Sequence, residues 1–155
     1  MAIITLNNNA LVNADVGKVL QVVQNTNSTA ITTTSSTFVT TGLSASITPS
    51  SASNKILILC NTHAHSSNNS SSAIFTIFRG TVSGTDLGSG DGFGSLYSGF
   101  SGEKRAIMSI KNLDSPSTTS SQTYTLGFKA GASSNTQTAQ LNNTKAVMIL
   151  MEIAG

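Results

Sequence analysis

The chain has 155 residues, of which only 9% are charged, and a formal net charge of +2, so we expect one domain with one core. Its eight Lys and Arg residues are scattered along the sequence, which excludes a surface that tracks nucleic-acid phosphates. Because β-branched residues are frequent and charge is scarce, the composition also excludes a disordered chain. Thr, Val and Ile suit strands, and Ser, Asn and Gly suit turns, so the composition favours β-structure over helix.

Residues 1–16 carry Asn7-Asn8-Asn9 between a few apolar positions and predict an N-terminal arm that docks on a partner. A single domain is expected over residues 17–155. The N-terminus lacks the basic start and long apolar segment of a signal peptide, and no apolar stretch approaches the ~20 residues of a spanning helix. We therefore predict no membrane insertion, and synthesis in a reducing host cytoplasm followed by assembly into something larger.

The next part of the chain predicts several strands separated by polar turns. The first is Lys18–Gln24, and short strands follow at 30–33 and 37–40, before Gly42 is expected to break the series. Residues 43–48 alternate apolar with polar side chains at period two. That alternation indicates a strand with one buried face and one wet face.

Two strongly apolar runs occupy the middle of the chain. Residues 55–60 are apolar at successive positions, which indicates a central strand covered on both faces, and its continuation to His65 is expected to return to solvent. Cys60 lies in this run as the sole cysteine, so an intrachain disulfide is impossible and a buried core thiol is predicted. Residues 73–79 form the second run, and we expect the two runs to pair as antiparallel neighbours.

The remainder begins with a glycine-rich excursion over 81–102 that contains aromatic anchors and predicts a long loop. The strands predicted after it are 103–113, 122–130 and 146–153, separated by a turn at 114–117 with its own side-chain acceptors and a polar stretch at 131–140. The strand at 122–130 alternates well, with Tyr124, Leu126 and Phe128 on one face. The last strand is expected to complete a sheet beside an earlier one.

Roughly eight to ten strands at this spacing, without a convincing helix, predict an all-β fold. We expect a two-sheet antiparallel sandwich that is jelly-roll-like, with the short N-terminal arm in front of it. An open barrel is the alternative. A fixed internal repeat is absent from the sequence, which disfavours a solenoid or a propeller.

The carboxylates give no local acid–base pair, because no two are spaced to lie side by side on one strand. They are Asp15, Asp86, Asp91, Glu103, Asp114 and Glu152. A glycosidase could still assemble two of them across the fold, since its carboxylates need only lie roughly 5 to 10 Å apart. We predict no catalytic residues and no cofactor.

Two local patterns are candidate metal sites. His63 and His65 are two residues apart, so on an extended strand both imidazoles project from the same face. A third ligand is missing nearby unless a trimer axis brings copies together, and histidines at a polar strand end are the simpler interpretation. The run 88–94 lacks the ending of a phosphate loop and predicts a flexible glycine loop, with Asp86 and Asp91 as candidates for a Ca²⁺ site. We predict that the chain holds no resident metal.

Several segments, taken in order, resemble a known group of proteins. They are Gly17–Val23, Leu43–Ile58, Phe78–Thr81, Leu113–Ser117 leading to Tyr124, and Glu152–Ile153. Together they resemble the β-rich appendage and fibre modules in virion proteins of tailed bacteriophages, and the similarity spans most of the chain. The resemblance implies parts of long fibres or small particle-surface proteins, commonly homotrimeric, with no catalytic residues.

The resemblance implies a non-enzymatic virion structural protein on the particle surface. Because no shaft repeats precede the module, we expect a homotrimeric capsid decoration (cement) protein whose partners are itself and the major capsid protein or other virion proteins. Several modest contacts per trimer then add through high effective concentration. The alternative is the receptor-binding tip of a tail fibre or spike, in which the excursion at 93–100 binds a host surface glycan. An enzyme that degrades host glycans is a third hypothesis.

Overall fold

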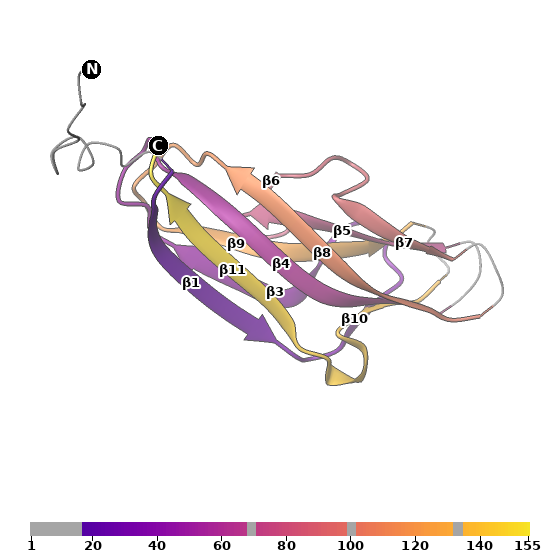
Figure 1. The fold of residues 1–155 in the computed structure, drawn as a ribbon. Helices are drawn as coiled ribbons and strands as arrows, with labels where there is room; N and C mark the ends of the chain where they lie inside the picture. Colours follow the sequence, from indigo (N-terminus) through magenta and orange to yellow (C-terminus); the bar gives the residue numbers. More distant parts are fainter. Residues whose placement is uncertain (1–16, 68–70, 99–101, 132–134) are drawn as a thin grey trace, which may run out of the picture.

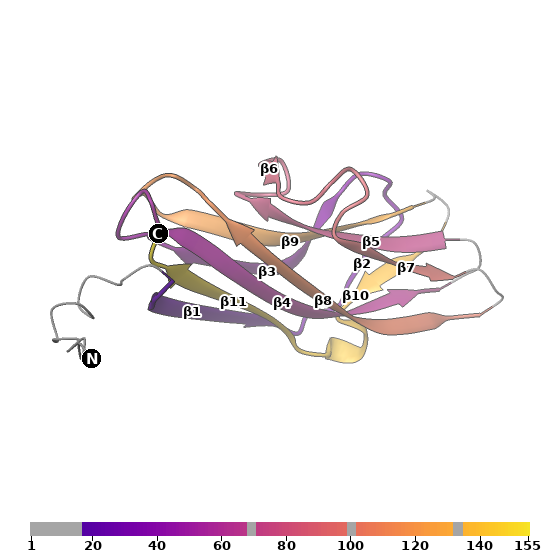
Figure 2. The same ribbon diagram turned by 45° about the horizontal axis from the view of Figure 1, so that its top comes forward.

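Two antiparallel β-sheets stack face to face in the computed structural model (Figures 1 and 2). The structure describes residues 17–67, 71–98, 102–131 and 135–155, so the predicted arm at 1–16 lies outside the described residues. Within these ranges the one helical element is a 3-10 turn at Leu141–Asn143. The described residues form no helix with the length and apolar character of a membrane span.

Sheet A carries β1, β11, β4 and β8 side by side, and the short strands β10 and β2 extend it beside the end of β4. Its strands are β1 (Val19–Asn27), β2 (Ile31–Thr33), β4 (Lys55–Ser66), β8 (Lys104–Asp114), β10 (Gln137–Ala139) and β11 (Ala146–Ile153). In sheet B, β9 lies between β3 and β5, and β5 also pairs with β6 and β7. Its strands are β3 (Val39–Ile47), β5 (Ser71–Arg79), β6 (Thr85–Asp86), β7 (Gly94–Ser98) and β9 (Gln122–Ala130).

The principal strands pair as nested hairpins, from the outermost to the innermost. β1 pairs with β11, β3 with β9, β4 with β8, and β5 with β7. The chain therefore folds as one long hairpin that is rolled up, and the β11–β4 and β9–β5 ladders join its turns. This is jelly-roll connectivity, and it confirms the predicted fold class.

The core lies between the two sheets and consists of the inward-facing residues of each strand. Tyr124, Leu126 and Phe128 are fully buried, as the alternation in this strand predicts, and Phe128 stacks on Phe75 with ring centroids 5.6 Å apart. Cys60 is buried on the inner face of sheet A, and burial raises the pKa of its thiol to about 12. A thiol in this position is a packing group and not a nucleophile.

The expected pairing of the two apolar runs at 55–60 and 73–79 is wrong. The first run lies in β4 of sheet A and the second in β5 of sheet B, so the connection between them crosses from one sheet to the other. Each run pairs with strands that come later in the sequence. In a jelly roll, neighbours in sequence are often separated in space, and local apolar pattern contains no information about this.

Gly42 does not break the strand that contains it. β3 runs continuously over Val39–Ile47, and the register shifts between Thr40 and Ser44, which marks a bulge. Gly42 has a φ of +78°, and a Cβ at this position would lie 2.6 Å from Nδ2 of Asn27. The glycine therefore bends the strand in a left-handed conformation that a residue with a Cβ adopts at a cost.

The far end of β4 is buried, so the expected return to solvent at His65 is also wrong. β10 pairs with this end, with Thr138 opposite His65 and Gln137 opposite Ser66. β10 lies inside the stretch 131–140, which the sequence predicts as a polar connection. Gln137 is fully buried there, and its side-chain amide donates to Oγ of Ser71 at 2.7 Å. The polar composition of this strand gives no apolar signal, because the strand is held by ladder pairing and by the side-chain amide of Gln137.

Candidate interaction surface

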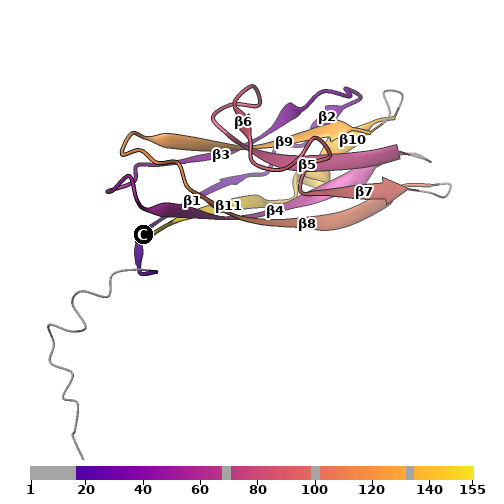
Figure 3. The ribbon, with the colours of Figure 1, turned by 90° about the horizontal axis from the view of Figure 1, so that it is seen from above.

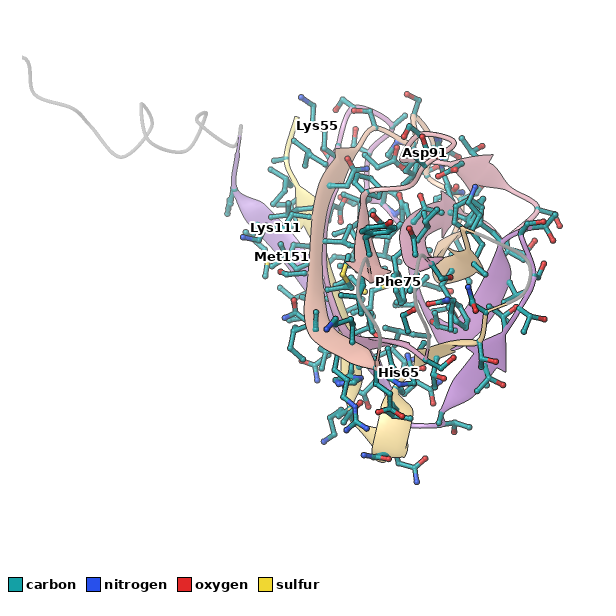
Figure 4. All side chains as sticks on the ribbon, turned by 90° about the vertical axis from the view of Figure 1, so that its right-hand side faces the viewer. Lys55, His65, Phe75, Asp91, Lys111 and Met151 are labelled. Atoms are coloured by element: carbon teal, nitrogen blue, oxygen red, sulfur yellow. The ribbon has the colours of Figure 1, made fainter. Side chains whose placement is uncertain are left out.

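The outer face of sheet A is lined by apolar side chains in register across four strands. Opposite one another in one row lie Val22 of β1, Met151 of β11, Leu57 of β4 and Leu113 of β8. In Figure 4, Met151 and Lys111 lie on the outer side of sheet A, whereas Phe75 lies between the sheets. We call this surface the open face. Its apolar residues are Val19, Val22, Leu57, Leu59, Ile107, Leu113, Val147, Ile149, Met151 and Ile153.

The open face is accessible in the described part of the chain. Ile107 is 68% exposed, Val22 57% and Leu113 50%, and the members on the two middle strands are partly exposed. With four strands about 4.8 Å apart and seven residues per strand, the whole outer face measures about 19 Å by 24 Å, or about 450 Å². Gln24, Asn61 and Ser109 occupy part of it, so its apolar area is smaller. The largest apolar patch on a typical monomer is about 300–600 Å² and is often functional. The open face is therefore a candidate contact surface.

Charge is confined to the margins of the open face. Lys55 lies at the first residue of β4, and Lys111 and Arg105 lie on the edge strand β8. Arg105 donates to the exposed Glu103 at 2.8 Å, just before β8 begins. No carboxylate lies on the outer face of β1, β4, β8 or β11. A partner that contacts the centre of the face therefore needs no complementary charges.

The outer face of sheet B contains apolar side chains too, but the chain itself covers them. Phe78 is 4% exposed and makes an edge-to-face contact with Phe38, with ring centroids 5.4 Å apart. Nζ of Lys129 lies 4.5 Å from the centroid of the Phe38 ring and donates to the carbonyl of Gly90. Figure 3 shows β6 and its flanking loops on the side of sheet B away from sheet A. The long loop predicted at 81–102 is therefore only partly a cover: β6 and its flanking loops lie over sheet B, whereas Gly94–Ser98 forms strand β7 of that sheet.

His63 and His65 lie on β4, where alternation places both side chains on the same face, as the sequence predicts. His65 is buried, with its Nε2 3.6 Å from a carboxylate oxygen of Glu103. Burial, with added repulsion from Arg105 and His65, lowers the pKa of His63. Among the described residues, no group of three or more His, Cys, Asp or Glu is placed to hold a metal ion. The two histidines therefore lack a third protein ligand within the described part of one chain.

Asp86 and Asp91, the candidates for a Ca²⁺ site, have different environments. Oδ1 of Asp86 accepts hydrogen bonds from the Thr76 hydroxyl and from the backbone N–H of Gly88. Asp91 is exposed in the glycine loop. Asp86 thus ties β6 to β5, and the described residues do not bring the two carboxylates into a metal-binding group.

Asp114 is a structural carboxylate, not the turn acceptor that the sequence predicts. It is buried at the end of β8, where it accepts a hydrogen bond of 2.7 Å from the Tyr124 hydroxyl and lies 3.3 Å from Nε of Arg79. Burial and the bond to this carboxylate raise the pKa of Tyr124. The group links β8 of sheet A to β5 and β9 of sheet B.

Glu152 is the most extensively bonded carboxylate. It is buried at the end of β11 and accepts hydrogen bonds from Gln21, Ser50 and Asn54. Burial by itself raises the pKa of Glu152, but the donors from Asn54, Gln21 and Ser50 outweigh it and lower the pKa to about 2. The carboxylate therefore stays ionised, and its hydrogen bonds link the turn after β3 to sheet A.

The described residues form neither the carboxylate pair nor the metal sites that the sequence analysis left open. Their buried carboxylates bond to hydroxyls, amides, a guanidinium and backbone donors, and no cavity is found among these residues. The open face was missed at the sequence level, although its signal was present. Residues 56–60 and 146–151 are apolar at successive positions, a pattern that predicts burial on both faces but does not distinguish a cover from the same chain from one supplied by another chain.

Comparisons with known proteins give likenesses of fold only. No protein-family model matches the chain, and no curated protein matches it. Among solved structures, it is similar to a point mutant of the VP2 protein of infectious bursal disease virus from derived T=1 particles, at 10% identity and a TM-score of 0.46. It is also similar to the Gx strain structure of this virus (12%, 0.48) and to its VP2 subviral particle (14%, 0.42).

These matches cover 86–90% of this chain but only 37–38% of the viral chains. The chain therefore spans less than two fifths of the length of the proteins it matches. Likenesses at this level concern the path of the chain and do not indicate a function.

Proposed function

We propose that this chain is a non-enzymatic structural protein of a tailed-bacteriophage particle, where it decorates the capsid as a homotrimer. The observation that carries the proposal is the open face of sheet A, where one apolar row runs in register over four strands and the charges lie at the margins. Such a surface suits lasting contact with other protein subunits. The ordered resemblance of its segments to phage appendage modules supports the same role.

A cement role follows physically from several weak attachments made at once. Each copy of a trimer contributes its own contact with the coat, and the second and third contacts form at high effective concentration. Few charges are needed for this, and only 9% of the residues are charged. The apolar row on the open face then supplies contact with the coat without charge pairing.

Phage particles made with and without this protein test the proposal. We expect particles that lack it to lose their genomes at lower temperature and after milder osmotic shock, with normal resistance restored when purified protein is added back. Imaging of the complete particle should place the chain on the capsid. Equal resistance of both particles, or no copy of the chain on the particle, would contradict the proposal.

A second candidate function is the receptor-binding tip of a tail fibre or spike. Tyr97 favours it, because this side chain of β7 is 62% exposed, and an exposed aromatic ring can stack on a sugar. Phe93, by contrast, packs against the core and anchors the same excursion. Purified protein should then block phage adsorption to host cells, and Tyr97→Ala should remove that block. Unchanged adsorption in excess protein would eliminate this candidate.

A further inference from the structure

We propose that the open face of sheet A docks on an acidic protein surface of the capsid, whose carboxylates pair with lysines at the margins of the face. This inference deepens the proposed function and rests on it, because it names the chemistry of the coat surface that the chain would bind. Its basis is the charge at the margins of the face, the side chains between those charges, and the area of the face.

Three exposed lysines surround the open face. Lys55 begins β4, Lys111 lies on the edge strand β8 opposite Leu59, and Lys145 directly precedes β11. Figure 4 shows Lys111 on the outer side of sheet A, where Met151 also lies. None of the three lysines forms an ion pair with a described residue. The margin of the face therefore presents positive charge that the described part of the chain does not neutralise.

The described carboxylates are used elsewhere. Four of them accept hydrogen bonds or form ion pairs with other groups, and these are Asp86, Glu103, Asp114 and Glu152. Asp91 lies in the glycine loop, which belongs to the connections around β6 and β7 of sheet B. Because these groups leave the three lysines unpaired, complementary charge for the open face has to come from a partner.

The side chains between the lysines distinguish a protein partner from a nucleic acid or a lipid surface. The apolar row contains Val22, Met151, Leu57 and Leu113, and a polar row contains Thr26, Asn61 and Ser109. Phosphates and sugars placed against the apolar row would lose their bonds to water without replacement, and acyl chains would do the same to the polar row. A protein surface offers both apolar side chains and hydrogen-bonding groups. A protein with carboxylates around such a surface therefore fits the whole face.

A second copy of the same face is a poor partner by charge. It would bring three further lysines, and no carboxylate lies on the outer face of its described strands. Like charges brought together at an interface oppose binding. The open face therefore calls for a surface unlike itself.

The area of the face favours a partner that presents the same surface many times. The whole face is about 450 Å², so contact with one partner buries about 900 Å² in total, below the roughly 1,200–2,000 Å² of stable interfaces. A single contact is therefore weak. Lasting attachment needs several linked copies on a repeating surface, which the proposed trimer and a capsid provide.

The first test measures binding of the purified chain to particles that lack it, with two matched lysine variants. Lys111 is the outward lysine of β8 in sheet A, and Lys129 is the outward lysine of β9 in sheet B, where it donates to Gly90. An exposed ion pair contributes a factor of up to about five to affinity, and a glutamate would replace attraction with repulsion. We expect Lys111→Glu to weaken binding by about 10-fold and Lys129→Glu to bind like the original chain.

Salt provides a second readout in the same experiment. Binding of the original chain should weaken as the NaCl concentration rises, because salt screens exposed charges. Binding of Lys111→Glu should depend less on salt than binding of the original chain. Cooperative thermal unfolding of both lysine variants would establish that they are folded.

The second test identifies the groups that lie beside the lysines. A carbodiimide couples a lysine amine directly to a carboxylate in contact with it and leaves no spacer. In decorated particles we expect amide cross-links from Lys55, Lys111 or Lys145 to aspartates or glutamates of the major capsid protein, identified by mass spectrometry. Lys129 should give none.

Several outcomes would overturn the proposal. Cross-links from the three lysines to Asp15 would mean that residues 1–16 cover the face, and cross-links to another copy would mean that copies pack there. Binding of the original chain to duplex DNA or to phosphatidylglycerol vesicles, lost in Lys111→Glu, would replace the acidic protein with a phosphate.

The particle measurements also separate this inference from the function on which it rests. Particles that bind Lys111→Glu as well as the original chain would refute this interface and leave the decoration role standing. Failure of the original chain to bind particles would refute the decoration role and the proposed partner together.

Discussion

The outer faces of the two sheets have similar side chains but different surroundings. On sheet B, Ile74, Thr76 and Phe78 of the central strand are buried, although they point away from the core between the sheets. On sheet A, the corresponding side chains of β4, Leu57 and Leu59, remain partly exposed. One face is covered by the chain's own excursion, and the other is covered by none of the described segments.

Apolar patterning on an outer face therefore does not by itself distinguish a covered strand from a contact surface. What distinguishes them is whether the connections of the fold pass over that face. In this jelly roll, the connection between β5 and β7 is long enough to fold back over sheet B, whereas the outer face of sheet A has no such connection among the described residues. The open face is therefore available to another chain.

The largest expected effect comes from truncating one side chain on each outer face. Phe78→Ala should lower the free energy of unfolding by about 3–4 kcal/mol, because it empties a buried site beneath Phe38. Leu57→Ala should cost about 1 kcal/mol, because its side chain already contacts water. Both should be measured by urea denaturation at low protein concentration. Equal losses of stability would show that the two faces are covered to the same degree, which would contradict the difference between them.

The second prediction concerns Glu152, whose buried carboxylate bonds the turn after β3 to sheet A. The folded pKa of Glu152 is about 2, below its ordinary value of 4.5, so its stabilisation is fully present above about pH 4.5 and is lost as the pH falls toward 2. Glu152→Gln should cost on the order of 2 kcal/mol at neutral pH and reduce this acid sensitivity. Denaturation curves between pH 2 and 7 measure both effects.

Glu103→Gln is the matched control for that experiment. Glu103 is an exposed carboxylate whose described partners are Arg105 and His65. Its removal should change the acid profile less than the removal of Glu152. A larger change in the control would mean that the donors around Glu152 do not hold its charge in solution.

The third prediction concerns the contact between sheet B and its cover. A Cβ added at Gly127 would lie 2.7 Å from Cε2 of Phe78 and 3.4 Å from Cγ1 of Val82. Gly127→Ala should therefore displace the cover and cost about 1–3 kcal/mol through overpacking. Gly90→Ala, where a Cβ meets nothing within 4 Å, is the control and should be nearly neutral. Similar stabilities for the two variants would show that the cover adjusts freely.

The sequence predicts the local structure of this protein well because side-chain alternation reports directly on a strand with one buried face. The strand at 122–130 is confirmed as β9, and the run 146–153 is confirmed as β11 between β1 and β4. Partnership between strands was predicted less well. The pairing of 55–60 with 73–79 is wrong because strand order in a jelly roll depends on contacts distant in sequence.

The candidate surface was harder to predict for a related reason. Leu57 and Leu59 give the same pattern whether a cover comes from the same chain or from another one. The polar strand β10 was missed because Gln137 and Thr138 are buried through internal hydrogen bonds and ladder pairing, without apolar character. Burial of polar groups depends on their partners, and those are set by the three-dimensional fold.

The smallest expected effect is at the polar end of the open face, where His63 faces Ile107 of β8. We expect EDTA to leave the thermal midpoint unchanged, because His63 and His65 lack a third ligand among the described residues and the positive charge of Arg105 disfavours a bound cation. A metal bound at this position would need ligands beyond His63 and His65. A midpoint that falls with EDTA, recovers with Zn²⁺ and becomes insensitive in His63→Ala would establish that site. An unchanged midpoint in EDTA would show that the fold needs no metal at this position.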